Sequence, residues 1–254
     1  MTSARRVALV TGSSSGIGAA VALGLAEAGH DVIINYSRNA DGAQSVVERC
    51  RNVGVESMAL QADVADEQGV QAMMDAIRGE YGRLDVLCNN AGTSIDTLAR
   101  DFDKVSVEDF DRVMSVNVRG LFLVAKHARS LLEAGEEPVM VNTASIVGLR
   151  PGPQPLPYLA SKAAIVAMTQ AFCLALGPKV RVNAVAPGWL EGDWMEWMLG
   201  DKYEKLMEQR AKVTPLKRCC TAEDVAEVVV TLVRHMKFVT GETIVIDGGF
   251  ARTT

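Results

Sequence analysis

The chain has 254 residues, of which 48% are hydrophobic, and a formal net charge of −5 at pH 7. This length and hydrophobic content suit a single large domain with a substantial core, which we predict over residues 1–254. The acidic balance and the scattered basic residues exclude the electrostatic pattern of a nucleic-acid-binding protein, so no nucleic acid partner is expected.

Apolar strands alternate with amphipathic helices from the first residues onward, which is the pattern of βαβ units. The expected fold is therefore a Rossmann-like α/β domain, with a doubly wound, seven-stranded parallel sheet and helices on both faces. Strands are predicted near residues 7–11, 31–36, 55–60, 84–88, 137–144, 179–186 and 243–246. Helices are predicted near residues 16–29, 40–53, 66–81, 106–134, 158–176, 202–211 and 221–234.

A glycine-rich turn, Gly12-x-x-x-Gly16-x-Gly18, follows the first predicted strand. Glycines let the chain turn tightly and bring backbone N–H groups close to a pyrophosphate, so the turn predicts a dinucleotide site. The spacing differs from G-x-G-x-x-G, and a Gly/Ser turn before a helix is also a common structural feature. The predicted contacts in the turn are Gly12, Ser14, Ser15, Gly16, Ile17 and Gly18.

The second strand ends without a carboxylate, in Asn35-Tyr36-Ser37-Arg38. NAD-selective folds often place an acidic residue there, whereas an arginine can pair with the 2′-phosphate of NADP. We therefore predict NADP as the preferred cofactor and NAD as the alternative, with Ser37 and Arg38 as contacts; Arg38 could instead be a solvated surface charge. Asp63 and Val64, after the third strand, are predicted near the adenine, unless Asp63 belongs to a helix cap.

Tyr158 and Lys162 are four residues apart and share a helical face. A phenol with a free pKa of roughly 10 is a poor base at neutral pH. A nearby ammonium favours the phenolate, so Lys162 is expected to lower the pKa of Tyr158. The pair predicts a redox enzyme that uses a tyrosine as its acid or base.

Two segments interrupt the alternation of strands and helices: the proline-rich run at 148–157 and the segment at 187–214. Both follow predicted strands, and ligands of such sheets bind beyond the strand C-termini, so both are expected to wall a substrate pocket. The second segment is the predicted substrate loop or lid. Its tryptophans fit a lid over an apolar substrate, and equally core packing or a subunit contact.

Five cysteines form no C-x-x-C motif and no His/Cys cluster with metal-ligand spacing, so reduced thiols and no metal site are expected. The polar start, Met1 to Arg6, leaves no room for a secretory signal. No apolar run approaches the ~18 residues of a membrane span. These features predict a soluble, cytoplasmic protein without a membrane association.

The motifs resemble, in order and across nearly the whole chain, those of the short-chain dehydrogenase/reductase family. They are Thr11-Gly12-x-x-x-Gly16-x-Gly18, Asn89-Asn90-Ala91-Gly92, Asn117, Ser145, Tyr158-x-x-x-Lys162, Pro187-Gly188 and Asp247-Gly248-Gly249. The resemblance includes members that act on 3-oxoacyl groups and on sugars. Family members are commonly tetramers or dimers, which implies a homotetramer or homodimer.

The resemblance also implies a role for each catalytic residue. Tyr158 would exchange a proton with the substrate oxygen, Ser145 would polarise that oxygen, and Lys162 would hold the nicotinamide ribose. Asn117 would position a water that links Lys162 to bulk solvent. The remaining implied cofactor contacts are Asn90, Ala91, Gly92, Pro187, Gly188 and Leu190.

Two positions depart from the family pattern. Ser15 stands where NADP-preferring members often carry a basic residue, which leaves Arg38 to support the NADP prediction. Gly192 replaces a usual threonine, so one hydrogen bond to the cofactor is expected to be absent.

The expected activity is hydride transfer between a nicotinamide cofactor and a small, neutral, fairly apolar carbonyl compound or secondary alcohol. Reduction of 3-oxoacyl groups on an acidic carrier protein ranks second, because acidic residues in the lid would repel that carrier. These residues are Glu191, Asp193, Glu196 and Asp201. A cofactor-binding sensor without chemistry is the third alternative.

Overall fold

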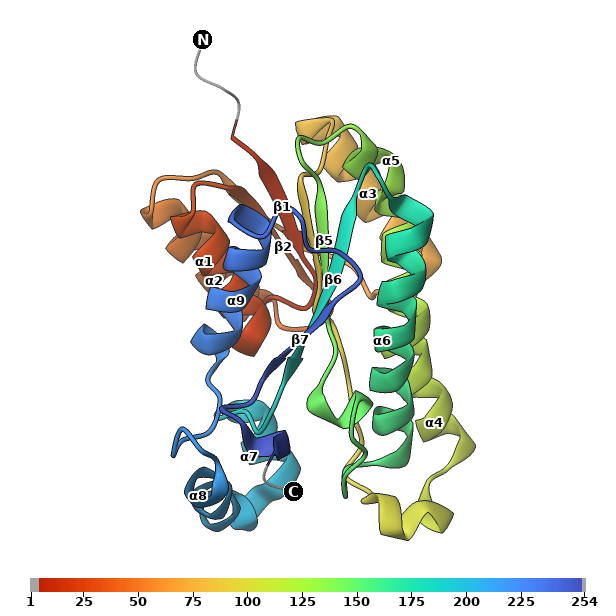
Figure 1. Ribbon diagram of the computed structural model, residues 1–254. Helices are drawn as coiled ribbons and strands as arrows, with labels where there is room; N and C mark the ends of the chain where they lie inside the picture. The colour runs from red at the N-terminus through yellow and green to blue at the C-terminus, as the bar shows by residue number, and fades with distance from the viewer. Residues whose placement is uncertain (1–4, 253–254) are drawn as a thin grey trace.

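The computed structural model describes residues 5–252, so both ends of the predicted domain, 1–4 and 253–254, lie outside the described residues. A seven-stranded parallel sheet runs through its centre, with strand order β3-β2-β1-β4-β5-β6-β7 (Figure 1). The strands are β1 (Val7–Val10), β2 (Asp31–Tyr36), β3 (Ser57–Gln61), β4 (Val86–Asn89), β5 (Val139–Thr143), β6 (Arg181–Pro187) and β7 (Thr243–Ile246). The predicted doubly wound fold is confirmed.

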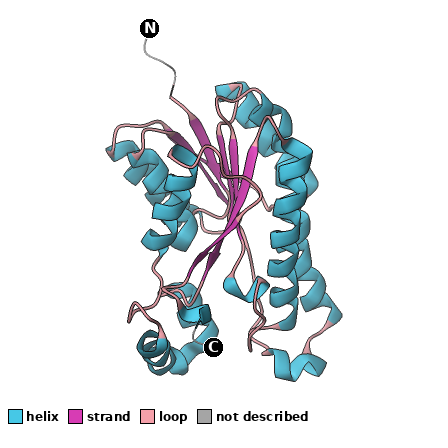
Figure 2. Ribbon diagram, in the orientation of Figure 1, coloured by secondary structure: helices cyan, strands magenta, loops and turns pink. Residues whose placement is uncertain are grey.

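Helices cover both faces of this sheet, as Figure 2 shows in cyan around the magenta strands. One face carries α1 (Gly16–Glu27), α2 (Ala40–Asn52) and α9 (Ala222–Arg234). The other carries α3 (Glu67–Tyr81), α4 (Val107–Met114), α5 (Leu121–Glu133) and α6 (Leu156–Leu176). Two further helices, α7 (Asp193–Leu199) and α8 (Tyr203–Val213), lie beyond the carboxyl ends of the strands.

Burial of the strands on both faces explains their continuous apolar sequences. All four residues of β1 and of β4 are buried. One buried cluster lies between the sheet and α1, α2 and α9, and a second lies between the sheet and α3 and α5. The sheet is therefore a rigid base from which loops project at one edge.

The helix predicted over 106–134 is interrupted. Residues Ser115–Gly120 form a π-helical turn between α4 and α5. The hydrophobic pattern continues through this turn, so the sequence did not reveal it. Asn117, whose side-chain contacts are described below, lies within this turn.

Two other boundaries differ from the prediction. The segment Asp193–Leu199, which was not assigned a helix, forms α7, and α6 begins at Leu156, inside the proline-rich run. Pro157 occupies the first turn of α6, where a missing N–H costs no hydrogen bond. A short 3₁₀ helix at Ala99–Lys104 was also not predicted.

The apolar length of α6 was underestimated. Among the described helices, α6 is long and apolar enough by length and composition to cross a membrane, contrary to the sequence expectation. It is weak evidence for a membrane span, because a core helix of a globular domain passes the same test. Ser161, Lys162, Ile165 and Thr169 of α6 are buried.

Candidate active site

A cavity of about 1600 Å³ lies at the carboxyl edge of the sheet, where the strand order reverses between β1 and β4. This switch point is where open α/β sheets bind ligands. The cavity brings together nearly all the residues predicted from the sequence. Gly18 and Asn117 are the two predicted site residues that do not line it.

Tight packing around the glycine-rich turn accounts for two of its glycines. Gly12 has φ +60°, and a Cβ there would lie 2.8 Å from the Cα of Ala91. A Cβ at Gly18 would clash with the Gly12 carbonyl oxygen. Gly18 therefore packs behind the turn and allows its shape. It does not line the cavity, so the prediction that it contacts the cofactor directly is not supported.

Two asparagines hold the turn against the neighbouring strands. The Asn90 amide nitrogen donates to the carbonyl oxygens of Thr11 and Gly12, both at 3.1 Å. Asn35 accepts from the Gly12 N–H at 3.2 Å and donates to the Ala62 carbonyl at 3.0 Å. Asn35 was not singled out as a site residue, although a buried polar residue within an apolar strand is a signal that could have found it.

The turn leads into a helix end suited to an anion. Ser15 is the N-cap of α1 but makes no side-chain capping bond, and the first turn of α1 contains no acidic residue. Free N–H groups and the positive end of the helix dipole favour a phosphate there. The glycine-walled space and this helix end fit the pyrophosphate of a dinucleotide.

Two arginines lie at the end of the cavity formed by β2 and α2. Arg38, from the loop after β2, and Arg49, from α2, both line it together with Ser37. The carboxylate of Asp63 accepts from the Ala65 N–H at 2.9 Å, while Asp66 caps α3. The segment 63–66 thus supplies the N-cap of α3 through Asp66, while Asp63 and Val64 line the cavity. Sequence reasoning missed Arg49.

The proposed acid–base group occupies the base of the cavity. Ser145, which follows β5, and Tyr158 of α6 both line the cavity, and the Ser145 hydroxyl donates to the Pro187 carbonyl oxygen at 3.4 Å. The Lys162 Nζ lies 5.5 Å from the centroid of the Tyr158 ring and donates to the Thr143 carbonyl at 2.7 Å. The shared face expected from the four-residue spacing is confirmed.

The electrostatic effect expected of Lys162 is not found. Burial raises the pKa of Tyr158 to about 12, opposed by the hydrogen bond from Ser145. Burial also lowers the pKa of Lys162 to about 8. The expected depression of the Tyr158 pKa is therefore wrong for this structure, because desolvation dominates and the ammonium points to Thr143 rather than to the phenol oxygen.

Buried hydrogen bonds fix α6, and so Tyr158 and Lys162, against the sheet. Asn89 of β4 donates to Asn142 of β5 at 2.9 Å, and Asn142 donates to Thr169 of α6 at 3.0 Å. Buried hydrogen bonds of this kind hold elements in one arrangement.

Asn117 contributes from outside the cavity. It is 1% exposed, and its amide nitrogen donates to the Thr93 carbonyl and to the Ser161 hydroxyl, both at 2.9 Å. Its side-chain oxygen accepts from the Thr93 N–H at 2.7 Å. Both side-chain donors are therefore occupied, so the implied water would need the remaining lone pair or a main-chain group of the π-helical turn.

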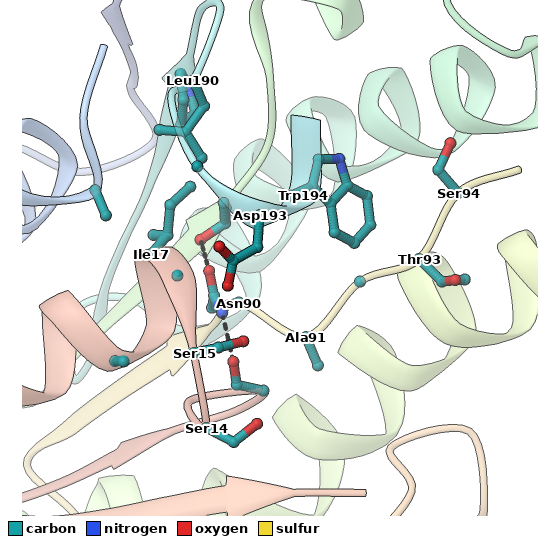
Figure 3. Close-up of a pocket in the computed structure, with 18 of the residues that line it drawn as sticks. Ser14, Ser15, Ile17, Asn90, Ala91, Thr93, Ser94, Leu190, Asp193 and Trp194 are labelled. Atoms are coloured by element: carbon teal, nitrogen blue, oxygen red, sulfur yellow. Dashed lines mark hydrogen bonds between the residues drawn. The ribbon is translucent and has the colours of Figure 1, made fainter. Parts of the chain in front are cut away.

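The opposite end of the cavity is formed by the loop after β4 and by α7. Figure 3 shows the Trp194 ring between Asp193 and the Thr93–Ser94 segment, with Ser14 and Ser15 of the glycine-rich turn farther into the site. Arg112 of α4 lies there too, bonded to Thr93 at 3.3 Å. Sequence reasoning did not assign Thr93, Ser94 or Arg112.

The backbone between β6 and α7 is tied down at several points. Leu190 forms a bridge with Cys220, and the Gly192 N–H donates to the Tyr203 hydroxyl at 3.1 Å. Gly192 has φ +115° and ψ −175°, a conformation essentially restricted to glycine. A threonine would be strained in this conformation.

No group of three or more potential metal ligands comes together within residues 5–252. None of the three histidines, His30, His127 and His235, lines the cavity. The five cysteines are free, and four of them are buried.

Comparisons with known proteins agree with this architecture. The family profile described as "Enoyl-(Acyl carrier protein) reductase" matches residues 12–251. The chain is 35% identical, over 244 residues, to a 3-oxoacyl-[acyl-carrier-protein] reductase of Staphylococcus aureus, covering 95% of this chain and 96% of that protein. It is 37% identical, over 256 residues, to a short-chain dehydrogenase/reductase of Pestalotiopsis microspora, covering 96% and 94%.

A solved structure shares the fold. The gluconate 5-dehydrogenase of Burkholderia cenocepacia, crystallised with NADP and tartrate, superimposes with a TM-score of 0.88 at 30% identity, covering 98% of this chain and 96% of that one. The fold and these relatives define an oxidoreductase that acts on CH–OH or carbonyl groups. The chain belongs to the short-chain dehydrogenase/reductase family.

Proposed function

We propose that this protein is an NADP-preferring carbonyl reductase or alcohol dehydrogenase that uses Tyr158 as its proton donor or acceptor. The observation that supports this most strongly is that Ser145, Tyr158 and the buried Lys162 line the same cavity as the glycine-rich turn. A nicotinamide bound there would supply or accept the hydride.

The protein's own groups would handle the oxygen and its proton. In carbonyl reduction, Ser145 and Tyr158 would both hydrogen-bond to the substrate oxygen, and Tyr158 would donate its proton as negative charge develops there. A phenol whose pKa is raised to about 12 holds its proton at neutral pH, which suits this direction. The Lys162 ammonium would hold the cofactor ribose, and Asn90 would keep the turn in place.

A substrate panel tests the proposal directly. Purified protein would be assayed with small ketones and secondary alcohols, using NADPH or NADP in parallel with NADH or NAD, by following nicotinamide absorbance. We expect reduction of neutral ketones with a preference for NADPH. Tight cofactor binding in calorimetry without turnover of any compound would favour a non-catalytic sensor.

The NADP preference should depend on both arginines near α2. Arg38→Ala and Arg49→Ala should each raise the KM for NADPH roughly tenfold, because a charge-assisted bond to the 2′-phosphate is lost. The KM for NADH should change little. Arg234→Ala, an exposed arginine of α9 that does not line the cavity, is the matched control. Equal changes for both cofactors would argue against a 2′-phosphate contact.

Reduction of 3-oxoacyl groups on a carrier protein is the second candidate, favoured by the Staphylococcus aureus relative. Against it, Glu191, Asp193, Glu196 and Asp201 are all exposed, and the first two line the cavity, so they would repel an acidic carrier. Kinetics with a 3-oxoacyl carrier protein and with the matching N-acetylcysteamine thioester separate the two. A higher kcat/KM for the carrier-bound form would support this second function.

Assembly into a homotetramer or homodimer also remains a proposal. The outer faces of α4, α5 and α6 expose Val107, Phe122 and Leu174, an apolar surface that a second copy could cover. Light scattering would give the molar mass. The cytoplasmic location, the lack of a membrane association and the lid role of 187–214 stay predictions.

A further inference from the structure

Helix α7 directs two tryptophans into the substrate end of the cavity. Trp194 and Trp197 both line it, and they remain 37% and 61% exposed. Met195, between them in sequence, is buried on the other side of the helix. Because a large apolar ring exposed inside a cavity gains free energy when a ligand covers it, these two rings are candidates for substrate contact.

The two rings form an angled surface. Their centroids are 6.0 Å apart and their planes are tilted by 59°. Aromatic rings prefer offset or edge-to-face partners at such separations, so a third ring can pack against both. Figure 3 places the Trp194 ring across from Thr93 and Ser94, on the loop that follows β4.

This surface is held in a fixed position. The segment leading into α7 is bonded to Cys220 through the Glu191 N–H at 2.9 Å, and to Tyr203 through Gly192. The third tryptophan, Trp189, does not line the cavity and packs between Phe250 and the Arg210 guanidinium, which lies 4.7 Å from its ring. Trp189 thus anchors the segment, while Trp194 and Trp197 face the ligand space.

The charges around the tryptophans are mainly negative. Three exposed carboxylates, those of Asp96, Glu191 and Asp193, line the same end of the cavity. The cation on this wall, Arg112, lies 3.4 Å from the Asp109 carboxylate, which partly neutralises it. An anionic substrate would meet repulsion here, whereas a neutral or cationic one would not.

We propose that the substrate is a carbonyl compound or secondary alcohol that bears a ring and no negative charge, and that its ring packs against Trp194 and Trp197. This rests on the proposed function, because it assigns the part of the substrate that lies beyond the oxygen held by Ser145 and Tyr158. It also assigns α7 to substrate binding rather than to a subunit contact.

Matched ketones and matched variants test the proposal. Acetophenone, 4-acetylbenzoate, (4-acetylphenyl)trimethylammonium and 2-butanone would be assayed with wild type, Trp194→Ala, Trp194→Phe and Trp197→Ala. Phe238→Ala is the control, because Phe238 is fully exposed before β7, outside the cavity lining. Binding of 1-phenylethanol to the enzyme–NADP complex, measured by calorimetry, gives a readout independent of turnover.

We expect each alanine variant to raise the KM for acetophenone roughly tenfold, which corresponds to the loss of one aromatic contact, and to change the KM for 2-butanone by less than about threefold. Trp194→Phe should recover most of the affinity, and wild type should use the anionic ketone least. The affinity for NADPH and the molar mass in light scattering should stay unchanged.

Equal losses for acetophenone and 2-butanone, unchanged binding of 1-phenylethanol, or a lower molar mass in the variants would each overturn the inference. If wild type reduces 2-butanone and the tryptophan variants reduce all the ketones as wild type does, the proposed role of Trp194 and Trp197 is overturned while the proposed function stands. Wild type that binds NADPH and reduces none of the four ketones would overturn the proposed function as well.

Discussion

Tyr158→Phe should lower kcat for ketone reduction by roughly a thousandfold, within the range that a positioned general acid contributes. The substitution removes the phenolic proton while keeping the ring, which packs against the cluster of Ile146, Val147 and Phe250. The dissociation constant for NADPH should therefore stay within about twofold of the wild-type value. Stopped-flow absorbance and calorimetry give the two quantities.

The control for this variant is Tyr81→Phe, which removes a phenol from α3, outside the cavity lining. Its kcat should match that of wild type. A Tyr158→Phe enzyme that retained more than about a tenth of the wild-type kcat would exclude the phenol as the essential acid.

Lys162→Met should abolish most turnover and at the same time raise the melting temperature near pH 7. Burial lowers the pKa of Lys162 from 10.5 to about 8, and a depression of this size corresponds to roughly 3 kcal/mol of unfavourable free energy for the buried ammonium. Losing the bond to Thr143 offsets about 1 kcal/mol of the gain. A net gain of roughly 4 °C is expected for a chain of this size.

The sign of this effect fixes its dependence on pH. The folded state binds the Lys162 proton less tightly than the unfolded state, so the cost is fully present below pH 8 and disappears as the pH rises from about 8 toward 10.5. The difference in melting temperature between the Lys162→Met variant and wild type should therefore shrink as the pH rises across that window. Calorimetric melting temperatures at pH 7 and pH 9.5 would show it, with the exposed Lys126→Met as the control.

A difference in melting temperature that stayed constant between these pH values would contradict a buried ammonium at Lys162. A destabilised variant at pH 7 would show that the hydrogen bond to Thr143 outweighs desolvation. Turnover should fall at least a hundredfold in either case, because Lys162 is assigned to hold the cofactor ribose.

The sequence allowed the sheet and most cavity residues to be predicted, because both follow from local patterns. Parallel strands buried on both faces read as apolar runs, and motifs that follow those runs converge at the same edge of the sheet. Gly12, Asn90, Ser145 and Tyr158 line one cavity for this reason.

What could not be predicted depends on tertiary contacts. Asn117, within the π-helical turn, bonds to Thr93 and Ser161, which are distant in sequence. Arg49 looks like any exposed helical arginine until the packing of α2 places it beside Arg38. The raised pKa of Tyr158 depends on burial, which the four-residue spacing does not contain.

One continuous segment carries both Pro187–Leu190, where cofactor contacts are proposed, and the tryptophans of α7. A cofactor bound to the first part would therefore form one side of the space in which the second part contacts the substrate. We expect the cofactor to bind first. The organic substrate would then bind in the space between the cofactor and α7. The enzyme should then follow a compulsory order of addition, with the oxidised or reduced nucleotide leaving last.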